Sequence, residues 1–356
     1  MKKILIVDDS ALVRRVLCDI INKDERFQVE DRATNGLEAL ELLGRKSYDA
    51  VVLDINMPKM NGLELLKQLQ KRQIDARVVV ASTDTKEGAK VTMDALELGA
   101  LDFVHKPDNA VGCRKEDFQR RLIEILVAAT ESKMTSFLKP TKTGTLKPAP
   151  KVVEVLSRHE KKPTGNRVVA IASSTGGPKA LQAVVPELPG RLNAPVVIVQ
   201  HMPAGFTASL AERLDTLSEL KVKEAQEGDV LENGTVYIAK GGKHLNVNVS
   251  GMKHVIHYTD QPLREGVKPC ADYMYESLTQ SRYDTVVCVV LTGMGADGTK
   301  GISNLELNKK IHVIAQNEDS CAVYGMPKNV VNAGLANQVV PLEQVAQEIM
   351  MNVGVM

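Results

Sequence analysis

The chain has 356 residues, a length typical of two domains, and 44% of them are hydrophobic, enough to build real cores. Its 45 Lys and Arg residues balance 44 Asp and Glu residues, which argues against a nucleic-acid-binding protein because such proteins usually carry a basic excess. The apolar run at residues 4–7 is too short for a secretory signal, and no stretch approaches the length that spans a bilayer. We therefore expect a soluble, cytoplasmic protein with no membrane insertion.

The five cysteines give no sign of a metal site or of a disulfide framework. Their number is odd, and they are scattered as Cys18, Cys113, Cys270, Cys288 and Cys321 without metal-ligand spacing. Free or buried thiols in a reducing cytosol account for this pattern.

Short apolar runs alternate with helical patterns in the first third of the chain. The predicted strands are residues 3–7, 27–30, 49–53, 77–81 and 102–104. The segments between them have helical periodicity, as at Leu63, Leu66 and Leu69. This alternation predicts an α/β domain over residues 1–130, with a parallel sheet covered by helices on both faces.

The pattern stops at a segment rich in Lys, Thr, Pro and Gly, which predicts an exposed linker at residues 131–165 with one short helix at 152–158. Alternation then resumes, and a second, doubly wound and mostly parallel α/β domain is expected over residues 166–356. Its predicted strands are residues 167–172, 195–200, 285–291 and 312–315. Residues 235–239 and 244–249 are predicted to form a small hairpin with each other.

Polar residues follow the predicted strands of the first domain, where functional groups of parallel sheets collect. They are Asp8, Asp9, Asp54, Ser82 and Lys106. Three converging carboxylates repel one another, and a hard divalent cation such as Mg²⁺ relieves that repulsion through oxygen ligands. An aspartate beside such an ion can attack a phosphoryl group, and a hydroxyl and an ammonium can then bind the phosphoryl oxygens.

Each acid taken alone could instead cap a helix, and Asp9 or Ser10 is well placed before Ala11 to do so. Five such groups at successive strand ends favour a shared site over five separate caps.

The blocks around these residues resemble the signatures of bacterial response-regulator receivers, whose fold is flavodoxin-like with a five-stranded parallel sheet. The blocks are Ile-Val-Asp-Asp-Ser at 6–10, Asp-Ile-Asn-Met-Pro-Lys-Met-Asn-Gly at 54–62 and Val-His-Lys-Pro at 104–107. The resemblance implies that Asp54 is the phosphoacceptor, Ser82 the switch hydroxyl and Lys106 the phosphate partner. It implies a Mg²⁺ site made by Asp8, Asp9, Asp54 and the backbone carbonyl of Asn56. Asn56 and Asn61 replace residues that are commonly acidic in such receivers, and Asn56 is expected to affect how long the phosphoryl group lasts.

Three residues in the second half have the chemistry of a serine hydrolase. Ser174 lies in the turn Ser-Ser-Thr-Gly-Gly-Pro directly after one predicted strand, His201 follows the next, and Asp297 follows a third. Strand-end placement lets nucleophile, base and orienting acid meet above the sheet. The residues alone leave two alternatives open: the Ser-Thr-Gly-Gly turn could bind phosphate, and His201 could be a core histidine.

Longer blocks resemble the chemotaxis protein-glutamate methylesterases, the CheB family, over nearly the whole chain except the linker. They are Ser-Thr-Gly-Gly-Pro at 174–178, Gln-His-Met-Pro-Ala-Gly-Phe-Thr at 200–207, Tyr-Ile-Ala-Lys-Gly-Gly-Lys-His-Leu at 237–245, Leu-Thr-Gly-Met-Gly-Ala-Asp-Gly at 291–298, Ala-Gln-Asn-Glu at 315–318 and Val-Tyr-Gly-Met-Pro at 323–327. The resemblance implies Ser174 as nucleophile, His201 as base and Asp297 as orienting acid. It makes the N–H of Met294 an oxyanion donor and Thr175 a support for the histidine. Ser174 is preferred to the adjacent Ser173 because it directly precedes Thr-Gly-Gly.

The family resemblance also implies an activity and its control. A phosphorylation-activated enzyme would hydrolyse glutamate γ-methyl esters on cytoplasmic helices of chemoreceptors, release methanol and deamidate receptor glutamines. A chemotaxis histidine kinase would supply the phosphoryl group, Mg²⁺ would serve only the receiver, and the esterase chemistry would need no cofactor. We expect a monomer that binds no nucleic acid. Two alternatives stay open: a response regulator with a catalytically idle protein-binding output domain, and a hydrolase of small esters.

Overall fold

A computed structural model describes residues 1–82, 86–107, 112–132 and 165–355. These residues belong to two compact units, Met1–Lys139 and Pro140–Met356, and each is described by itself below. The predicted helix at residues 152–158 lies outside the described residues.

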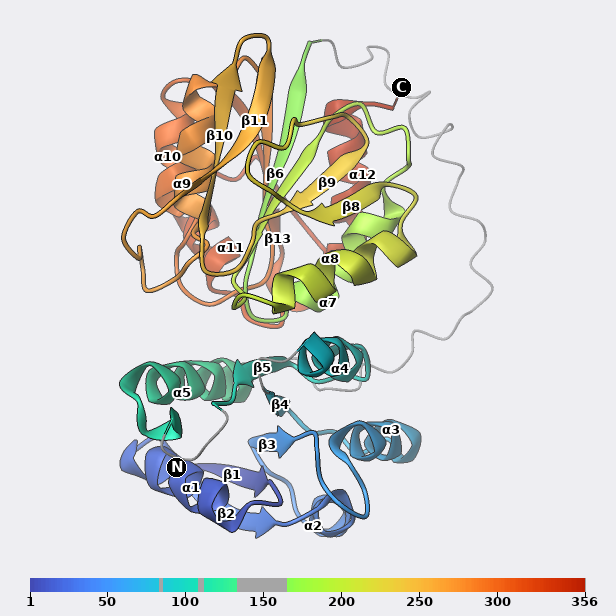
Figure 1. Cartoon of the computed structure of the whole chain (residues 1–356), viewed down its shortest axis with the longest axis vertical. Coiled ribbons are helices and arrows are strands. Elements are labelled where there is room, and N and C mark those ends of the chain that lie inside the picture. Colours follow the sequence, from blue (N-terminus) through green and yellow to red (C-terminus); the bar gives the residue numbers. More distant parts are fainter. Residues whose placement is uncertain (83–85, 108–111, 133–164, 356) are drawn as a thin grey trace. The chain divides into compact units, whose positions relative to one another are not determined.

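The first unit is built on a parallel sheet with the strand order β2-β1-β3-β4-β5 (Figure 1). Its strands are β1 (Lys2–Val7), β2 (Phe27–Ala33), β3 (Ala50–Asp54), β4 (Val78–Ser82) and β5 (Asp102–His105). Its helices are α1 (Ala11–Lys23), α2 (Gly36–Arg45), α3 (Gly62–Arg72), α4 (Lys86–Glu97) and α5 (Glu116–Glu131), with a 3₁₀ turn η1 (Gly112–Arg114). This is the flavodoxin-like order, and the predicted five-stranded parallel sheet is confirmed.

Burial explains why the strands of the first unit read as continuous apolar runs. Every residue of β3 and β4 is buried, because α1 and α5 pack on one face of the sheet and α2, α3 and α4 on the other (Figure 1). In the edge strand β2, exposed residues alternate with buried or half-buried ones instead. Its weaker apolar pattern is the reason that the sequence predicts only its first half.

The second unit has a seven-stranded parallel sheet in the order β14-β13-β12-β6-β7-β9-β8. Its strands are β6 (Arg167–Ser173), β7 (Val196–Gln200), β8 (Lys221–Glu224), β9 (Thr235–Ile238), β12 (Thr285–Val290), β13 (Lys310–Gln316) and β14 (Gln338–Val340). Its helices are α7 (Gly177–Val184), α8 (Phe206–Leu217), α9 (Ala271–Ser277), α10 (Thr299–Glu306), α11 (Met326–Asn332) and α12 (Leu342–Val353), with 3₁₀ turns η2 (Val185–Glu187), η3 (Leu278–Gln280) and η4 (Glu318–Ser320).

The strand order of the second unit reverses at its centre. From β6 the chain continues to β7 on one side, and it later builds β12, β13 and β14 outward on the other side. Figure 1 shows α7, α8 and α12 on one face of this sheet and α9, α10 and α11 on the other, so the unit is doubly wound as predicted. In such folds, ligands bind at the carboxyl ends of the strands where the order reverses, here beside β6, β7 and β12.

The predicted hairpin pairing is wrong. Thr235–Ile238 is β9, which lies inside the large sheet and pairs in parallel with β7 and β8. All four of its residues are buried, as expected for a strand covered on both faces. The hairpin is formed by β10 (His244–Ser250) and β11 (Lys253–Thr259), which pair antiparallel around a tight turn at Gly251.

The strands β8 and β14 were not predicted: β8 has four residues with Val222 as its one apolar residue, and β14 has only three residues. All five cysteines are free and buried, and burial raises the pKa of each thiol.

Within the ranges that the structure describes, no helix is long and apolar enough to cross a bilayer.

Candidate functional site

One end of the first sheet brings two buried carboxylates onto a single lysine. Asp8 directly follows β1, Asp54 ends the neighbouring β3, and Lys106 follows β5. The Lys106 Nζ donates to Asp8 Oδ2 at 2.6 Å and to Asp54 Oδ1 at 2.9 Å. The lysine side chain is only 13% exposed, so its positive charge offsets two negative charges within a largely desolvated site.

Burial and pairing set the pKa values of this cluster. Burial, reinforced by the nearby Asp8 charge, raises the pKa of Asp54 to about 6 although Lys106 opposes the shift. Burial by itself would lower the pKa of Lys106, but the two carboxylates outweigh it and the pKa is raised. Lys106 therefore stays protonated beside Asp54.

The same end of the sheet has the donor set of a hard cation. Carboxylate oxygens of Asp8, Asp9 and Asp54 lie within 4.8 Å of one another, and Asp9 is exposed, so the cluster is open to solvent. Asp54, Asn56 and Ser82 line a cavity of about 210 Å³. An all-oxygen set of this kind fits Mg²⁺. Ser10, rather than Asp9, caps α1 by accepting from Val13 N, which leaves Asp9 outside the capping role.

The Ser82 hydroxyl has a partner that the sequence reading missed. Thr92, a fully buried residue of α4, donates from Oγ1 to Ser82 Oγ at 2.6 Å, and its hydroxyl also lies 2.7 Å from the Gly88 carbonyl oxygen. A threonine on the buried face of an amphipathic helix is the only signal that could have drawn attention to it. Thr92 thus links the end of β4 to α4.

The second unit places the three candidate hydrolase residues around the reversal of its strand order. Ser174 lies in the turn between β6 and α7, His201 follows β7, and Asp297 lies in the loop between β12 and α10. These are three neighbouring strands of the sheet. Pro178 lies in the first turn of α7, and the Gly177 N–H donates to the Ser174 carbonyl at 2.7 Å, which makes the turn tight.

The two adjacent serines have different surroundings. Ser173 is fully buried, and its hydroxyl donates to Gln200 Oε1 at 2.6 Å. The Gln200 amide in turn donates to the Ser174 carbonyl at 2.9 Å. A Cβ on Gly177 would lie 1.9 Å from Gln200 Oε1, so this glutamine requires a glycine beside it. Ser173 and Gln200 therefore hold the turn, and the Ser174 hydroxyl is not part of that contact.

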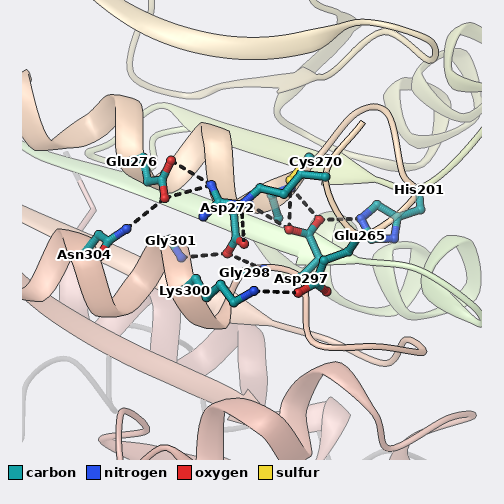
Figure 2. A network of polar contacts seen from close by, with 12 residues as sticks. His201, Glu265, Cys270, Asp272, Glu276, Asp297, Gly298, Lys300, Gly301 and Asn304 are labelled. Atoms are coloured by element: carbon teal, nitrogen blue, oxygen red, sulfur yellow. Dashed lines mark hydrogen bonds and ion pairs between the residues drawn. The ribbon is translucent and has the colours of Figure 1, made fainter. Parts of the chain in front are cut away.

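His201 and Asp297 are joined directly, as Figure 2 shows: His201 Nε2 lies 2.7 Å from Asp297 Oδ2. The same oxygen accepts from Ala271 N at 2.6 Å, while Oδ1 accepts from Asp272 N at 2.9 Å and lies 3.1 Å from Cys270 Sγ. Burial would raise the pKa of Asp297, but the His201 contact and the backbone N–H bonds lower it to about 2. Asp297 is thus a fixed anion. The described residues show no hydrogen bond between the side chains of Ser174 and His201.

The segment that precedes Asp297 packs closely against the serine turn. Ser174 N donates to the Thr292 carbonyl at 3.0 Å, and a Cβ on Gly293 would lie 2.7 Å from Ser174 Cβ. The Thr292 hydroxyl donates to the carbonyl of Thr175, which is itself buried. Met294 follows Gly293 in this segment and is 36% exposed. The sequence reading missed Thr292 as the link between the two loops.

Comparison with known proteins places both units. The response regulator receiver domain family matches residues 4–113, and the CheB methylesterase family matches residues 169–349. The protein-glutamate methylesterase/protein-glutamine glutaminase of Bacillus subtilis is 41% identical over 98% of this chain and 98% of its own. The protein of the same name from Pyrococcus abyssi is 40% identical over 98% of this chain and 92% of its own. The crystal structure of the Thermotoga maritima CheB methylesterase catalytic domain is similar, with 40% identity and a TM-score of 0.51 over 52% of this chain and 98% of that chain.

Proposed function

This chain belongs to the CheB methylesterase family, and we propose that it is a phosphorylation-activated protein-glutamate methylesterase that also deamidates glutamines. Its substrates are γ-methyl esters of glutamate on the cytoplasmic helices of chemoreceptors, and the product is methanol. The observation that carries the chemistry is the 2.7 Å contact between His201 and Asp297 beside the Ser174 turn. It gives a histidine an ionised partner next to a serine, which is the arrangement of a serine hydrolase.

We divide the chain into a receiver domain at residues 1–130, a linker at 131–165 and a catalytic domain at 166–356. The end of α5 at Glu131 and the start of β6 at Arg167 support these limits. Each domain carries one of the two clusters, so phosphorylation and hydrolysis take place on separate units.

We assign the roles of the two ring nitrogens of His201 from its contact with Asp297. Because Nε2 faces Asp297, that nitrogen carries the proton, and Nδ1 is left to accept the Ser174 proton. Ser174 Oγ then attacks the γ-carbonyl carbon, and the oxyanion is stabilised by the backbone N–H of Met294. His201 returns the proton to the departing methoxy oxygen, which leaves as methanol, or to the departing amide nitrogen of a glutamine, which leaves as ammonia. Water, activated by His201, hydrolyses the glutamyl-enzyme. Thr175 supports the histidine, and no cofactor takes part.

In the receiver, Asp54 accepts the phosphoryl group. Asp8, Asp9, Asp54 and the carbonyl oxygen of Asn56 would hold Mg²⁺, which neutralises phosphoryl charge when bound. Lys106, already 2.9 Å from Asp54, pairs with the phosphoryl oxygens, and Ser82 donates its hydroxyl to one of them. A chemotaxis histidine kinase is the phosphodonor. The enzyme acts in the cytoplasm as a monomer.

The testing experiment measures methanol release from membranes that contain methylated chemoreceptor, with and without a small phosphodonor and Mg²⁺. Release that rises with the phosphodonor supports the proposal. Release from a small chromogenic ester that greatly exceeds release from receptor would favour a small-ester hydrolase. No release from folded protein would favour an output domain that only binds a partner.

A further inference from the structure

Two buried aspartates near the catalytic centre each accept hydrogen bonds from backbone N–H groups at the start of the helix that carries or follows the other. Asp297 precedes α10, but its carboxylate accepts from Ala271 N and Asp272 N, the first residues of α9. Asp272 lies in α9, but its Oδ1 accepts from Gly298 N at 2.9 Å and from Gly301 N at 2.6 Å, at the start of α10. Figure 2 shows these contacts of Asp272 and Asp297.

We propose that Asp272 is a positioning residue that holds Asp297, and through it His201, in the reactive arrangement. This role rests on the proposed function of Ser174, His201 and Asp297. Asp272 lies 25 residues before Asp297 in the sequence, and its residue type and position gave no signal of this role.

The connection between the two aspartates forms a closed ring. Gly298 is the residue after Asp297, so the bond from its N–H to Asp272 Oδ1 fixes the peptide next to the catalytic acid. The Asp272 N–H donates in the opposite direction, to Asp297 Oδ1. One residue therefore restrains both the main chain and the carboxylate of Asp297.

The close approach of α9 and α10 is permitted by two glycines. A Cβ on Gly301 would lie 2.6 Å from Asp272 Cα, and Gly298 has φ of +96°, a conformation that other residues rarely adopt. A fully buried carboxylate is costly unless it is paired and hydrogen-bonded. Here the N–H groups of Gly298 and Gly301, at the N-terminus of α10, donate to Asp272 Oδ1. Arg264 Nε lies 3.3 Å from Asp272 Oδ2.

These contacts also explain why Cys270, Asp272 and Asp297 gather within 4.8 Å of one another, a grouping that could hold a metal ion. Both oxygens of Asp297 and Oδ1 of Asp272 already accept from backbone N–H groups. The cluster is thus accounted for by hydrogen bonding between two helix starts.

Glu276 provides a matched control. It also lies in α9, accepts from Arg264 at 2.8 Å and from Asn304 of α10 at 2.9 Å, and so ties the same two helices together. It makes no hydrogen bond to Asp297 or to the N–H groups at the start of α10 within the described residues. Glu276→Gln weakens the helix pair without touching the catalytic acid.

The first measurement is methanol release by full-length, phosphodonor-activated enzyme. Asp272→Ala should lower kcat about 100-fold with KM changed less than about twofold, because a small misplacement of Asp297 affects the transition state rather than binding. Asp272→Asn should restore most of the activity, to within about fivefold of wild type, since an amide oxygen still accepts from both glycines but more weakly than a carboxylate. Glu276→Gln should retain kcat within about twofold.

The second measurement follows the proton on His201 Nε2 by NMR, which does not depend on turnover. A proton shared with a carboxylate resonates far downfield, and Asp297→Asn identifies the signal by removing it. Asp272→Ala should shift or broaden this signal, and Glu276→Gln should leave it in place. If Asp272→Ala does not fold, Asp272→Asn alone decides, by a smaller shift and a kcat lowered at constant KM.

Wild-type kcat and an unmoved signal in the folded Asp272 variants would overturn the inference. Loss of kcat that Glu276→Gln reproduces would also overturn it, since helix packing alone would then explain the effect. If wild type releases no methanol but the signal moves as expected, the proposed function fails while the positioning role stands.

Discussion

The Ser173 hydroxyl donates to Gln200 Oε1 at 2.6 Å, which ties the end of β6 to the end of β7 and separates the role of Ser173 from that of Ser174. We predict that Ser174→Ala lowers kcat by at least about 10³-fold, because loss of a nucleophile leaves only the binding and oxyanion contributions. Methanol release from methylated receptor measures this.

Ser173→Ala is the matched control one residue away. It removes one hydrogen bond to Gln200 and should cost about 1 kcal/mol of unfolding free energy, with less than about tenfold loss of kcat. If Ser173→Ala were the inactive variant and Ser174→Ala the active one, the assignment of the nucleophile would have to be exchanged.

Asp54→Ala should abolish activation by a small phosphodonor and keep basal methanol release, because Asp54 lies in the first unit and carries no hydrolase chemistry. Chelation of Mg²⁺ should have the same effect on wild type. Phosphate incorporation and methanol release are measured in parallel. A variant that loses basal release as well would point to damaged folding, which thermal unfolding would reveal.

Thr92→Val should make activation easier. The Thr92 hydroxyl holds Ser82 Oγ at 2.6 Å, and Ser82 must leave this partner to reach a phosphoryl oxygen. Removing one hydrogen bond of about 1 kcal/mol predicts a roughly fivefold lower phosphodonor concentration at half-maximal activation. Ser82→Ala, which removes the switch hydroxyl itself, is the opposite control and should weaken activation. A Thr92→Val enzyme that needs more phosphodonor would show that the contact supports the active state.

A fragment that begins at Asn166 should be more active than the unphosphorylated full-length protein if the receiver restrains the hydrolase. The second unit has its own core and sheet, and a catalytic domain from Thermotoga maritima forms crystals by itself, so the fragment is expected to fold. A gain of 5–150-fold would correspond to roughly 1–3 kcal/mol of coupling. Equal activity of the fragment and the unphosphorylated chain would contradict inhibition.

The sequence predicts both parallel sheets because fully covered strands such as β3, β4 and β12 are unbroken apolar runs. It places Asp54, Ser174 and Asp297 at one end of their sheets for the same reason, since carboxyl ends of parallel strands share an edge. It does not reveal that β9 joins the large sheet, because a four-residue apolar run suits either a parallel or a hairpin strand. Asp272 escaped notice since an acid in the first turn of a helix is common, and its partners lie 26 and 29 residues further along.

Asp297 should make the second unit less stable in acid. The pKa of Asp297 is lowered to about 2 in the folded protein, below its pKa in the unfolded chain. Its ionised form therefore contributes its full stabilisation at pH values above the pKa of the unfolded chain, and this contribution is lost as the pH falls through about 2. A shift of nearly two units corresponds to roughly 2 kcal/mol. Asp297→Asn should therefore be less stable than wild type at pH 7, and the difference between their free energies of unfolding should become smaller toward pH 2. Hydrogen exchange of β12 amides, corrected for intrinsic rates, reports this free energy. A difference in free energy of unfolding that does not change with pH would contradict the prediction.

The buried thiols make the chain a convenient host for site-specific labels. Thiolate is the reactive form of cysteine, and all five native side chains are buried with raised pKa values, so maleimide reagents should react with them slowly. One cysteine added at an exposed position of each unit, such as Leu12 and Leu307, would then take up a fluorophore pair without removal of any native residue. Energy transfer between the two dyes would follow the separation of receiver and hydrolase in real time as phosphodonor is added.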